Sequence, residues 1–345
     1  MTMLRINWGR AAHQNVPENV PATVCARPKM SQGQPTGNEE TPRQISNSPR
    51  GPGVGCGLIS PVSEVQFLPP PPPLRSIARV TLWDAMTDIL VEHEGPIATI
   101  VFNRPKMRNA ISLAMWSEIA RVTEGLAKDD SVRAVVYRGA GRDAFASGAD
   151  ISEFKEHRKD TATALRYNAQ TSAAYTAIRE CAKPTVAMIF GFCMGGAMAV
   201  AMACDLRFAA EGSKFGIPAA RLSIIYGADA VGQLVDLVGP AYAKDILYSA
   251  RTVGDREALA MGFIQRLLPP DELESATYDY LRKIADNAPL SVRGAKGTIE
   301  AYLLGLTEER RTKLKDLALE AFESEDYKEG TRAFLEKRAP KFQGR

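Results

Sequence analysis

The sequence predicts an α/β fold in which a mostly parallel sheet packs against helices. Short apolar segments with strand character alternate with longer helical patterns after residue 95, which is typical of parallel sheets. Two of these strands lead into turns made of glycine and other small residues. The length of 345 residues allows one sizeable domain with appendages, because compact cores usually divide beyond about 250 to 300 residues.

The first predicted elements follow the turn at Gly95 and Pro96. Residues 98–102 are predicted to form a strand. Residues 113–126 have the apolar spacing of an amphipathic helix, and Ser112 is its expected N-cap. Further strands are predicted at 132–137 and 185–189.

The two ends of the chain differ in composition from its middle. Residues 1–85 contain 13 of the 22 prolines, including the run at 69–73. We expect this extension to be disordered, with a polyproline II stretch, because it can bury little apolar surface. The simplest interpretation is that translation starts at Met86. From residue 289 the chain is charged, with helices predicted at 295–304, 308–323 and 330–337.

The charge is small and unevenly distributed. The formal net charge is +3. Residues 1–85 hold eight of the 43 Lys and Arg residues and five of the 40 Asp and Glu residues, so 35 of each remain elsewhere. The remaining chain is therefore neutral, and nothing in it indicates a nucleic-acid partner. No apolar run approaches the ~20 residues of a membrane span, so we expect no membrane partner and a cytoplasmic location.

The cysteines indicate neither a metal site nor a disulfide framework, because their spacing matches neither pattern. We therefore expect no bound metal and a reducing compartment. Two of them lie in apolar runs and are expected to be buried core thiols. The five cysteines are Cys25, Cys56, Cys181, Cys193 and Cys204, of which Cys193 and Cys204 are the two in apolar runs.

The most informative segment is 189–199, where a strand at 186–189 passes through glycines into a small-residue helix at 197–203. The first turns of this helix contain no acid or base. Its free N–H groups and the positive end of its dipole could stabilise an oxyanion. Taken alone, the segment is more simply interpreted as a glycine-rich turn packed inside a core.

A second segment of the same kind strengthens the functional interpretation. The strand at 135–139 leads into another small-residue turn at 141–151, which is expected to open a helix. Two such turns could direct two backbone N–H groups at one carbonyl oxygen. That arrangement is what the enolate of a thioester requires.

Four blocks of the sequence resemble, in the same order, those of the crotonase superfamily, also called the enoyl-CoA hydratase/isomerase superfamily. The blocks are 103–112 (NRPKMRNAIS), 145–151 (FASGADI), 191–205 and 214–218 (KFGIP). The resemblance implies a core at 86–288 built as a spiral of repeated β-β-α turns. It also implies a C-terminal helical region at 289–345 that mediates a homotrimer or a dimer of trimers.

The resemblance also implies the site residues. It places the thioester oxyanion hole at the backbone N–H groups of Ala149 and Gly196. It expects Asp150 to cap or brace the first turn. The alternative interpretation of the charged residues at 104–108 is that they form a solvent-exposed turn and bind no ligand. The residues expected to contact substrate or coenzyme A are Lys106, Met107, Arg108, Ala110, Ser147, Gly148, Asp150, Ile151 and Gly195.

The sequence departs from the family pattern at two positions. Hydratases of the family carry one glutamate in the helix after the glycine pair and another after the Phe-Gly-x-Pro segment. Here these positions are Ala199 and Ala219. A general acid and a general base each contribute ~100- to 10,000-fold to the rate. An alanine side chain can act as neither. Hydration by the two-glutamate route is therefore in doubt.

Two nearby residues could take over the role of the missing glutamates. Tyr226 could donate a hydrogen bond or a proton to the acyl group, or could simply fill the pocket. Asp229 could act as a base, but a helix-capping role is its default.

The main functional hypothesis is an acyl-CoA enzyme that stabilises an enolate-like intermediate. No bound cofactor is expected, and coenzyme A enters only as part of the substrate. The first alternative is a decarboxylase of malonyl-type acyl-CoA that uses Tyr226, since loss of carbon dioxide itself generates an enolate. The second alternative is an oligomer that binds acyl-CoA without catalysis.

Overall fold

The computed structural model describes residues 87–345. The predicted disordered extension at 1–85 and its proline run lie outside the described residues. Within residues 87–345, no helix is long and apolar enough to cross a bilayer.

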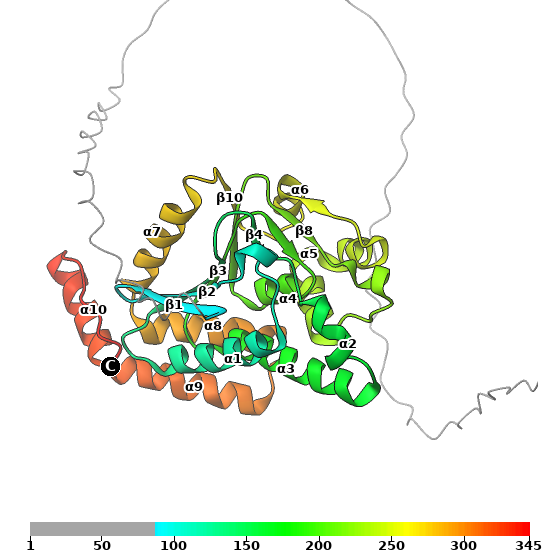
Figure 1. Cartoon of the computed structure of the whole chain (residues 1–345). Helices are drawn as coiled ribbons and strands as arrows, with labels where there is room; N and C mark the ends of the chain where they lie inside the picture. The colour runs from blue at the N-terminus through cyan, green and yellow to red at the C-terminus, as the bar shows by residue number, and fades with distance from the viewer. Residues whose placement is uncertain (1–86) are drawn as a thin grey trace, which may run out of the picture. The chain divides into compact units, whose positions relative to one another are not determined.

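The first of two sheets has six strands in the order β1-β2-β3-β5-β7-β10. All neighbouring pairs are parallel except β1 and β2, which form an antiparallel hairpin. Figure 1 shows helices around these strands. The strands are β1 (Ile89–Glu94), β2 (Ile97–Phe102), β3 (Ala134–Gly139), β5 (Thr185–Ile189), β7 (Leu206–Ala210) and β10 (Arg266–Leu268).

The second sheet has four short strands in the order β4-β6-β8-β9. Each of β3, β5 and β7 is followed by one strand of this sheet and then by helical structure. The chain thus repeats a β-β-α unit and forms the expected spiral. The strands are β4 (Ala144–Ala146), β6 (Phe192–Met194), β8 (Lys214–Gly216) and β9 (Val253–Gly254). The turn predicted at 141–151 to open a helix therefore contains strand β4.

The helices connect and cover the sheets. Ser112 caps α1 as predicted, since its side chain accepts a hydrogen bond from the Met115 N–H. The α-helices are α1 (Leu113–Lys128), α2 (Phe154–His157), α3 (Thr161–Glu180), α4 (Gly196–Ala203), α5 (Ala228–Ser249), α6 (Asp255–Ala260), α7 (Leu273–Ala285), α8 (Pro289–Leu303), α9 (Glu308–Glu323) and α10 (Glu325–Glu336), and the 3₁₀ helices are η2 (Pro105–Met107), η3 (Ile151–Glu153) and η4 (Pro218–Leu222).

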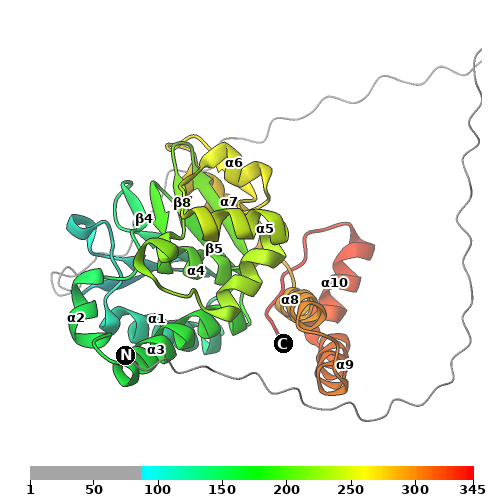
Figure 2. The ribbon, with the colours of Figure 1, turned by 90° about the vertical axis from the view of Figure 1, so that its right-hand side faces the viewer.

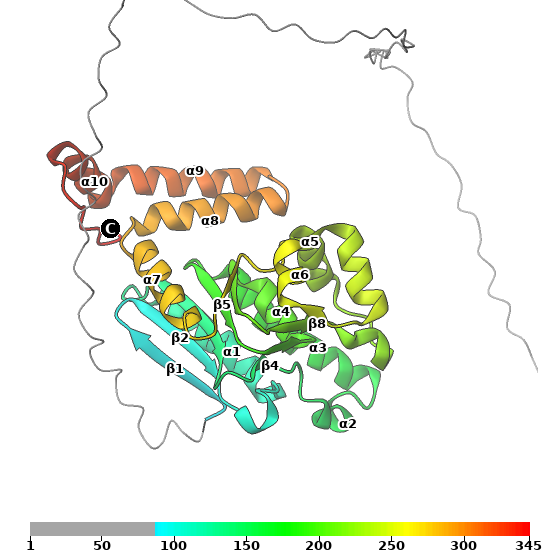
Figure 3. The ribbon, with the colours of Figure 1, turned by 90° about the horizontal axis from the view of Figure 1, so that it is seen from above.

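Side chains of the six-stranded sheet alternate between two apolar clusters, as the period of two in a strand requires. In β3, Val136 packs with Leu273 and Leu281 of α7, whereas Val135 and Tyr137 face the larger cluster that includes α1 and α4. Figure 3 shows α7 along one face of this sheet. The sheet is therefore buried on both faces, which is typical of parallel sheets.

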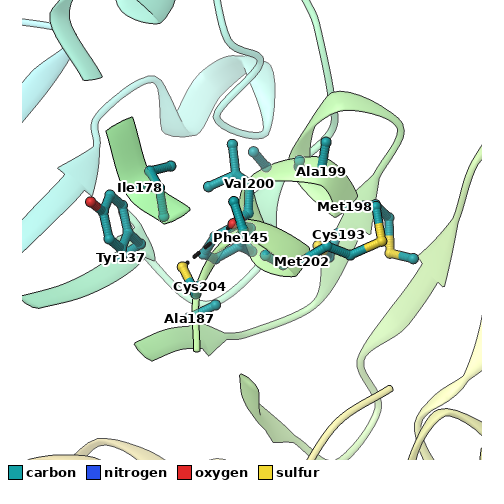
Figure 4. Close-up of a cluster of buried hydrophobic side chains, with 14 of the residues drawn as sticks. Tyr137, Phe145, Ile178, Ala187, Cys193, Met198, Ala199, Val200, Met202 and Cys204 are labelled. Atoms are coloured by element: carbon teal, nitrogen blue, oxygen red, sulfur yellow. Dashed lines mark hydrogen bonds between the residues drawn. The ribbon is translucent and has the colours of Figure 1, made fainter. Parts of the chain in front are cut away.

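Helix α4 lies inside the larger cluster. Every residue from Ala197 to Ala203 is buried. Figure 4 shows this helix among Phe145, Ile178 and Tyr137. A helix of small residues packed on all sides has little freedom to shift, so its N-terminus is held in place by the core.

The three cysteines of the described region are buried and free, so the prediction of core thiols is confirmed for Cys193 and Cys204. The Sγ of Cys204 donates to the carbonyl oxygen of Val200 at 3.4 Å (Figure 4). Burial raises the pKa of both thiols, so they stay protonated at neutral pH.

The C-terminal helices form a group beside the α/β part (Figure 2). Helices α8 and α9 lie side by side (Figures 2 and 3). Two ion pairs attach α8 to the rest of the chain: Glu300 to Arg179 at 2.8 Å, and Lys296 to Asp205 at 2.9 Å. Large apolar side chains on these helices are exposed, namely Ile299, Tyr302, Leu303, Leu304, Leu306, Leu319, Phe322, Tyr327, Phe334 and Leu335.

Candidate active site

The two small-residue turns meet. A Cβ atom built on Gly148 would lie 3.6 Å from the nitrogen of Gly196 and 2.9 Å from the carbonyl oxygen of Met194. Gly148 also has a φ of 106°. Any side chain at this position would therefore force the turns apart, and only glycine allows their close approach.

The N–H of Ala149 is directed away from its neighbouring strand-like segment. Ile111 and Ala149 form an isolated parallel bridge. In it, the Ile111 N–H donates to the Gly148 carbonyl at 2.8 Å, and the Asp150 N–H donates to the Ile111 carbonyl at 2.9 Å. This pattern uses the polar groups on either side of Ala149 and leaves its own N–H without an acceptor among residues 87–345.

Gly196 presents a second free N–H. It is the first residue of α4, where an N–H has no intrahelical partner. The preceding residue, Gly195, has φ 52° and ψ −118°, a conformation open to glycine. The Gly195 N–H donates to the Gly216 carbonyl at 2.8 Å, which fixes the turn. Within the described region, the Gly196 N–H has no acceptor.

Both turns line a cavity of about 730 Å³. Ala149 and Gly196 lie in its wall together with Trp116, Tyr175 and Tyr226. The cavity also reaches residues of α8 and α9. A thioester oxygen placed here would meet two unpaired N–H groups inside a largely apolar compartment, where such donors act strongly.

The charged loop around η2 divides into a structural and an exposed part. Arg104 is half-buried and donates to the Ala110 carbonyl at 2.8 Å and to Asp150 at 2.9 Å. Lys106 and Arg108 are exposed, and the Arg108 guanidinium lies 5.1 Å from the centre of the Phe192 ring. The exposed cations remain available to a phosphorylated ligand.

The remaining predicted contacts surround this loop. Ser147 is tied to it by two bonds, from its N–H to the Arg108 carbonyl at 2.9 Å and from its hydroxyl to the Met107 carbonyl at 3.3 Å. Met107 and Ile151 are exposed, and Ile151 also lines the cavity.

Asp150 braces the first turn, as its position in the family pattern implied. Its carboxylate accepts hydrogen bonds from the backbone and the hydroxyl of Ser152 and from Arg104. Burial by itself would raise the pKa of this carboxyl, but the bonds from Ser152 and Arg104 lower it overall. Asp150 is thus ionised and occupied, which leaves it unsuited to proton exchange.

Tyr226 lies in the cavity wall, but its hydroxyl is engaged. It donates to the carbonyl oxygen of Gly195 at 2.9 Å. Burial raises the pKa of this phenol well above its ordinary value. Asp229 is exposed in the first turn of α5, whose N-cap is Gly227, and it makes no side-chain capping bond. Its expected capping bond is therefore absent.

The two alanines at the family glutamate positions differ in location. Ala219 lines the cavity, whereas Ala199 is buried in the core and does not reach the cavity wall. Neither supplies an acid or a base. The carboxylates in the wall are Glu180, Asp229 and Glu300.

Tyr175 is a site residue that sequence reasoning missed. Its hydroxyl oxygen lies 3.4 Å from a Cβ built on Gly196 and makes no hydrogen bond within the described residues, while its ring packs edge-on against Trp116. Burial raises the pKa of this phenol. The sequence did contain a pattern that could have identified it, because residues four apart share one face of a helix. Four such residues of α3 line the cavity, namely Tyr167, Thr171, Tyr175 and Arg179.

The β-β-α spiral with its C-terminal helices is the fold of the crotonase class, which solved relatives of this chain share. The chain belongs to the enoyl-CoA hydratase/isomerase family, because the model of that family matches residues 92–345. Sequence and structure relatives agree with this assignment.

A short-chain-enoyl-CoA hydratase of Clostridium acetobutylicum is 32% identical over 253 residues, which are 73% of this chain and 96% of the relative. A solved enoyl-CoA hydratase/isomerase family protein from Hyphomonas neptunium is 37% identical with a TM-score of 0.73, covering 76% of this chain and all of the other. A solved enoyl-CoA hydratase/carnithine racemase from Magnetospirillum magneticum is 34% identical with a TM-score of 0.71, covering 76% of this chain and 98% of the other.

Proposed function

We propose that this protein is an acyl-CoA enzyme that binds the thioester oxygen between the N–H groups of Ala149 and Gly196. The observation that carries the proposal is that both N–H groups lack an acceptor among residues 87–345 and lie on touching turns. Polarisation of the carbonyl by two donors lowers the free energy of the enolate that forms when charge develops on the oxygen. Coenzyme A would be held as part of the substrate, with its phosphates near Lys106 and Arg108.

The reaction class is hydration or isomerisation of an enoyl thioester, and its proton carrier must come from outside the two alanine positions. We assign this role to Tyr175. Its hydroxyl hydrogen is not engaged elsewhere and lies beside Gly196. In the protonation step, the enolate α-carbon takes the phenolic proton, the O–H bond breaks, and the phenolate regains a proton from solvent. The raised pKa of the phenol keeps it protonated until a strong base such as an enolate is present.

Decarboxylation of a malonyl-type thioester by Tyr226 stays an alternative prediction, although the hydroxyl of Tyr226 is bonded to Gly195. Incubation of the purified protein with crotonyl-CoA and with methylmalonyl-CoA, followed by mass spectrometry, separates the two. A mass gain of one water supports hydration, and release of carbon dioxide supports the alternative. Binding of coenzyme A thioesters without turnover of any would indicate a non-catalytic binder.

The oxyanion assignment has a matched test in two variants of one residue. Gly196→Pro removes the N–H at a helix position that tolerates proline. Gly196→Ala keeps the N–H but adds the same Cβ, which would lie 3.1 Å from the Trp116 ring. We expect the proline variant to lose about 100- to 1,000-fold in kcat relative to the alanine variant. Equal activity of the two variants would overturn the assignment.

We further propose that the helices at 289–345 assemble the chain into a homotrimer or a dimer of trimers. The support is the row of exposed apolar side chains on α8, α9 and α10, because contiguous exposed apolar surface marks protein interfaces.

A further inference from the structure

Arg158 lies in the cavity wall and has an unsatisfied donor. Its guanidinium centre lies 4.9 Å from the ring centre of Phe154 and 4.8 Å from that of Tyr167. One terminal nitrogen donates to the side-chain oxygen of Asn168. The Nε is buried and has no hydrogen-bond partner. Among the described residues, no carboxylate pairs with this side chain.

The other cations of the cavity wall are neutralised. Arg179 pairs with Glu300 at 2.8 Å, Lys296 with Asp205 at 2.9 Å, and Arg293 with Glu320 at 2.5 Å. In the part of the chain that the structure describes, Arg158 is thus the cation of this cavity that lacks an opposite charge.

Such an arrangement costs stability. A buried donor without an acceptor costs about 1 to 3 kcal/mol, and more when the group is charged. In native structures such a donor is normally paired with an ordered water, an ion or a ligand. The rings of Phe154 and Tyr167 lie nearly perpendicular to each other with their centres 5.6 Å apart, so they pack on the same side of the guanidinium and leave its remaining donors for a planar acceptor.

The position of Arg158 relates it to the acyl group rather than to coenzyme A. It shares the cavity with Tyr175 and Gly196, and its charge acts on the hydroxyl of Tyr175. The exposed cations Lys106 and Arg108, in contrast, lie on the η2 loop and are not part of the cavity wall.

We propose that Arg158 binds a carboxylate carried by the acyl group, so that the substrates are dicarboxylic acyl-CoA thioesters with one free carboxylate. This inference rests on the proposed function. A guanidinium and a carboxylate form two parallel charge-assisted hydrogen bonds. The substrate would thereby supply the negative charge that the cavity lacks at this point.

The test compares pairs of saturated thioesters with equal carbon number, which have no double bond to hydrate or move, by calorimetric binding to the full chain: succinyl- with butyryl-CoA, glutaryl- with valeryl-CoA, and adipyl- with hexanoyl-CoA. We expect the carboxylate-bearing member of at least one pair to bind about tenfold more tightly or better. The chain length of the pair with the largest difference in affinity also indicates how far Arg158 lies from the thioester. Free coenzyme A serves as the reference for binding through the phosphates alone.

Variants locate the preference. In the Arg158→Gln variant, the two members of each pair should differ in affinity by no more than about twofold, and the methyl-ended thioesters should bind as they do to the wild type. Arg158→Lys keeps the positive charge and should retain part of the preference for the carboxylate. This second variant guards against the case in which Arg158→Gln simply misfolds. Arg256→Gln, which removes an exposed cation of α6 outside the cavity lining, should retain the preference.

Equal affinity within every pair, or a preference that survives Arg158→Gln, would overturn the inference while leaving the proposed function intact. Binding of coenzyme A with no contribution from any acyl group would overturn both.

Discussion

The hydroxyl of Tyr226 donates a hydrogen bond to the carbonyl oxygen of Gly195, and the same peptide group carries the N–H of Gly196 on its other side. The Met198 N–H also donates to this carbonyl, at 3.0 Å. Hydrogen bonds at the carbonyl end of a peptide polarise its N–H and hold its plane. In the proposed function, Tyr226 would therefore orient the N–H of Gly196 through this peptide group.

Tyr226→Phe should lower kcat by about fivefold and leave the KM for the acyl-CoA nearly unchanged, because one hydrogen bond of about 1 kcal/mol is lost and the bond from Met198 remains. Steady-state kinetics measure the effect. Tyr248→Phe is the control, since Tyr248 is 75% exposed on α5. A loss of several thousand-fold would instead mean that the Tyr226 hydroxyl acts on the substrate directly.

Asp150→Asn should destabilise the protein by about 2 kcal/mol at neutral pH, because charge-assisted bonds to Ser152 and Arg104 are weakened. The pKa of Asp150 is lowered in the folded state. Its stabilisation is thus present above the unfolded pKa of about 3.9 and disappears as the pH falls through the lower folded pKa. Denaturant unfolding of both proteins between pH 7 and acid should show the difference shrinking below about pH 4.

The control for this pH dependence is Asp316→Asn, which alters an exposed carboxylate of α9 without an ion pair. The bracing role would be contradicted if the free energies of unfolding of the wild type and of Asp150→Asn differed by the same amount at neutral and at low pH.

Arg207→Met should cost about 3 kcal/mol of stability. The Arg207 side chain is buried and donates to the carbonyls of Phe263 at 2.7 Å and Cys204 at 2.8 Å, so its loss leaves buried acceptors unpaired. Burial lowers its pKa to about 10, which still leaves it charged at neutral pH. Chemical denaturation measures the change, with the exposed Arg256→Met as control. Equal stability of the two variants would refute this prediction.

The three described thiols should resist alkylation in the native protein. Cys181, Cys193 and Cys204 are buried, and burial raises their pKa. Iodoacetamide at pH 8, followed by peptide mapping, should label each to less than about a tenth of its denatured level. Rapid native labelling of the Cys193 peptide would show instead that the glycine turn opens to solvent.

The proposed assembly predicts a mass of three or six chains by analytical ultracentrifugation. Phe334→Glu, which places a charge on a side chain that is 84% exposed on α10, should shift the mass toward the monomer, because burying an unpaired charge at an interface is costly. Val91→Glu on β1 provides the control. A monomeric wild-type chain at micromolar concentration would exclude the assembly.

The long elements could be predicted from sequence because their apolar periodicity extends over several turns or a whole buried strand. The bounds of α9 agree at both ends, and β2 and β5 agree to within one residue. Strands β4, β6, β8, β9 and β10 were missed, since two or three residues cannot establish a period of two, and the longer strands β1 and β7 were missed as well. Helix α10 begins at Glu325, five residues before the predicted start, because Ser324 caps it.

The site was predictable where its chemistry resides in backbone turns and not where it depends on packing. Glycines at 148 and 195 mark the turns in the sequence itself. Tyr175 and Arg158 come from polar stretches in which no residue pattern separates an inward from an outward position. Only the folding of α2 and α3 over the turns brings these two side chains into the same cavity.

The cavity extends from the glycine turns to α8 and α9, where Lys296, Glu300 and Leu317 belong to its wall. The segment that follows residue 288 therefore supplies one part of the cavity wall. A protein shortened to end there would keep its glycine turns but lose that part of the wall. The tail of helices thus completes the cavity that the glycine turns also line.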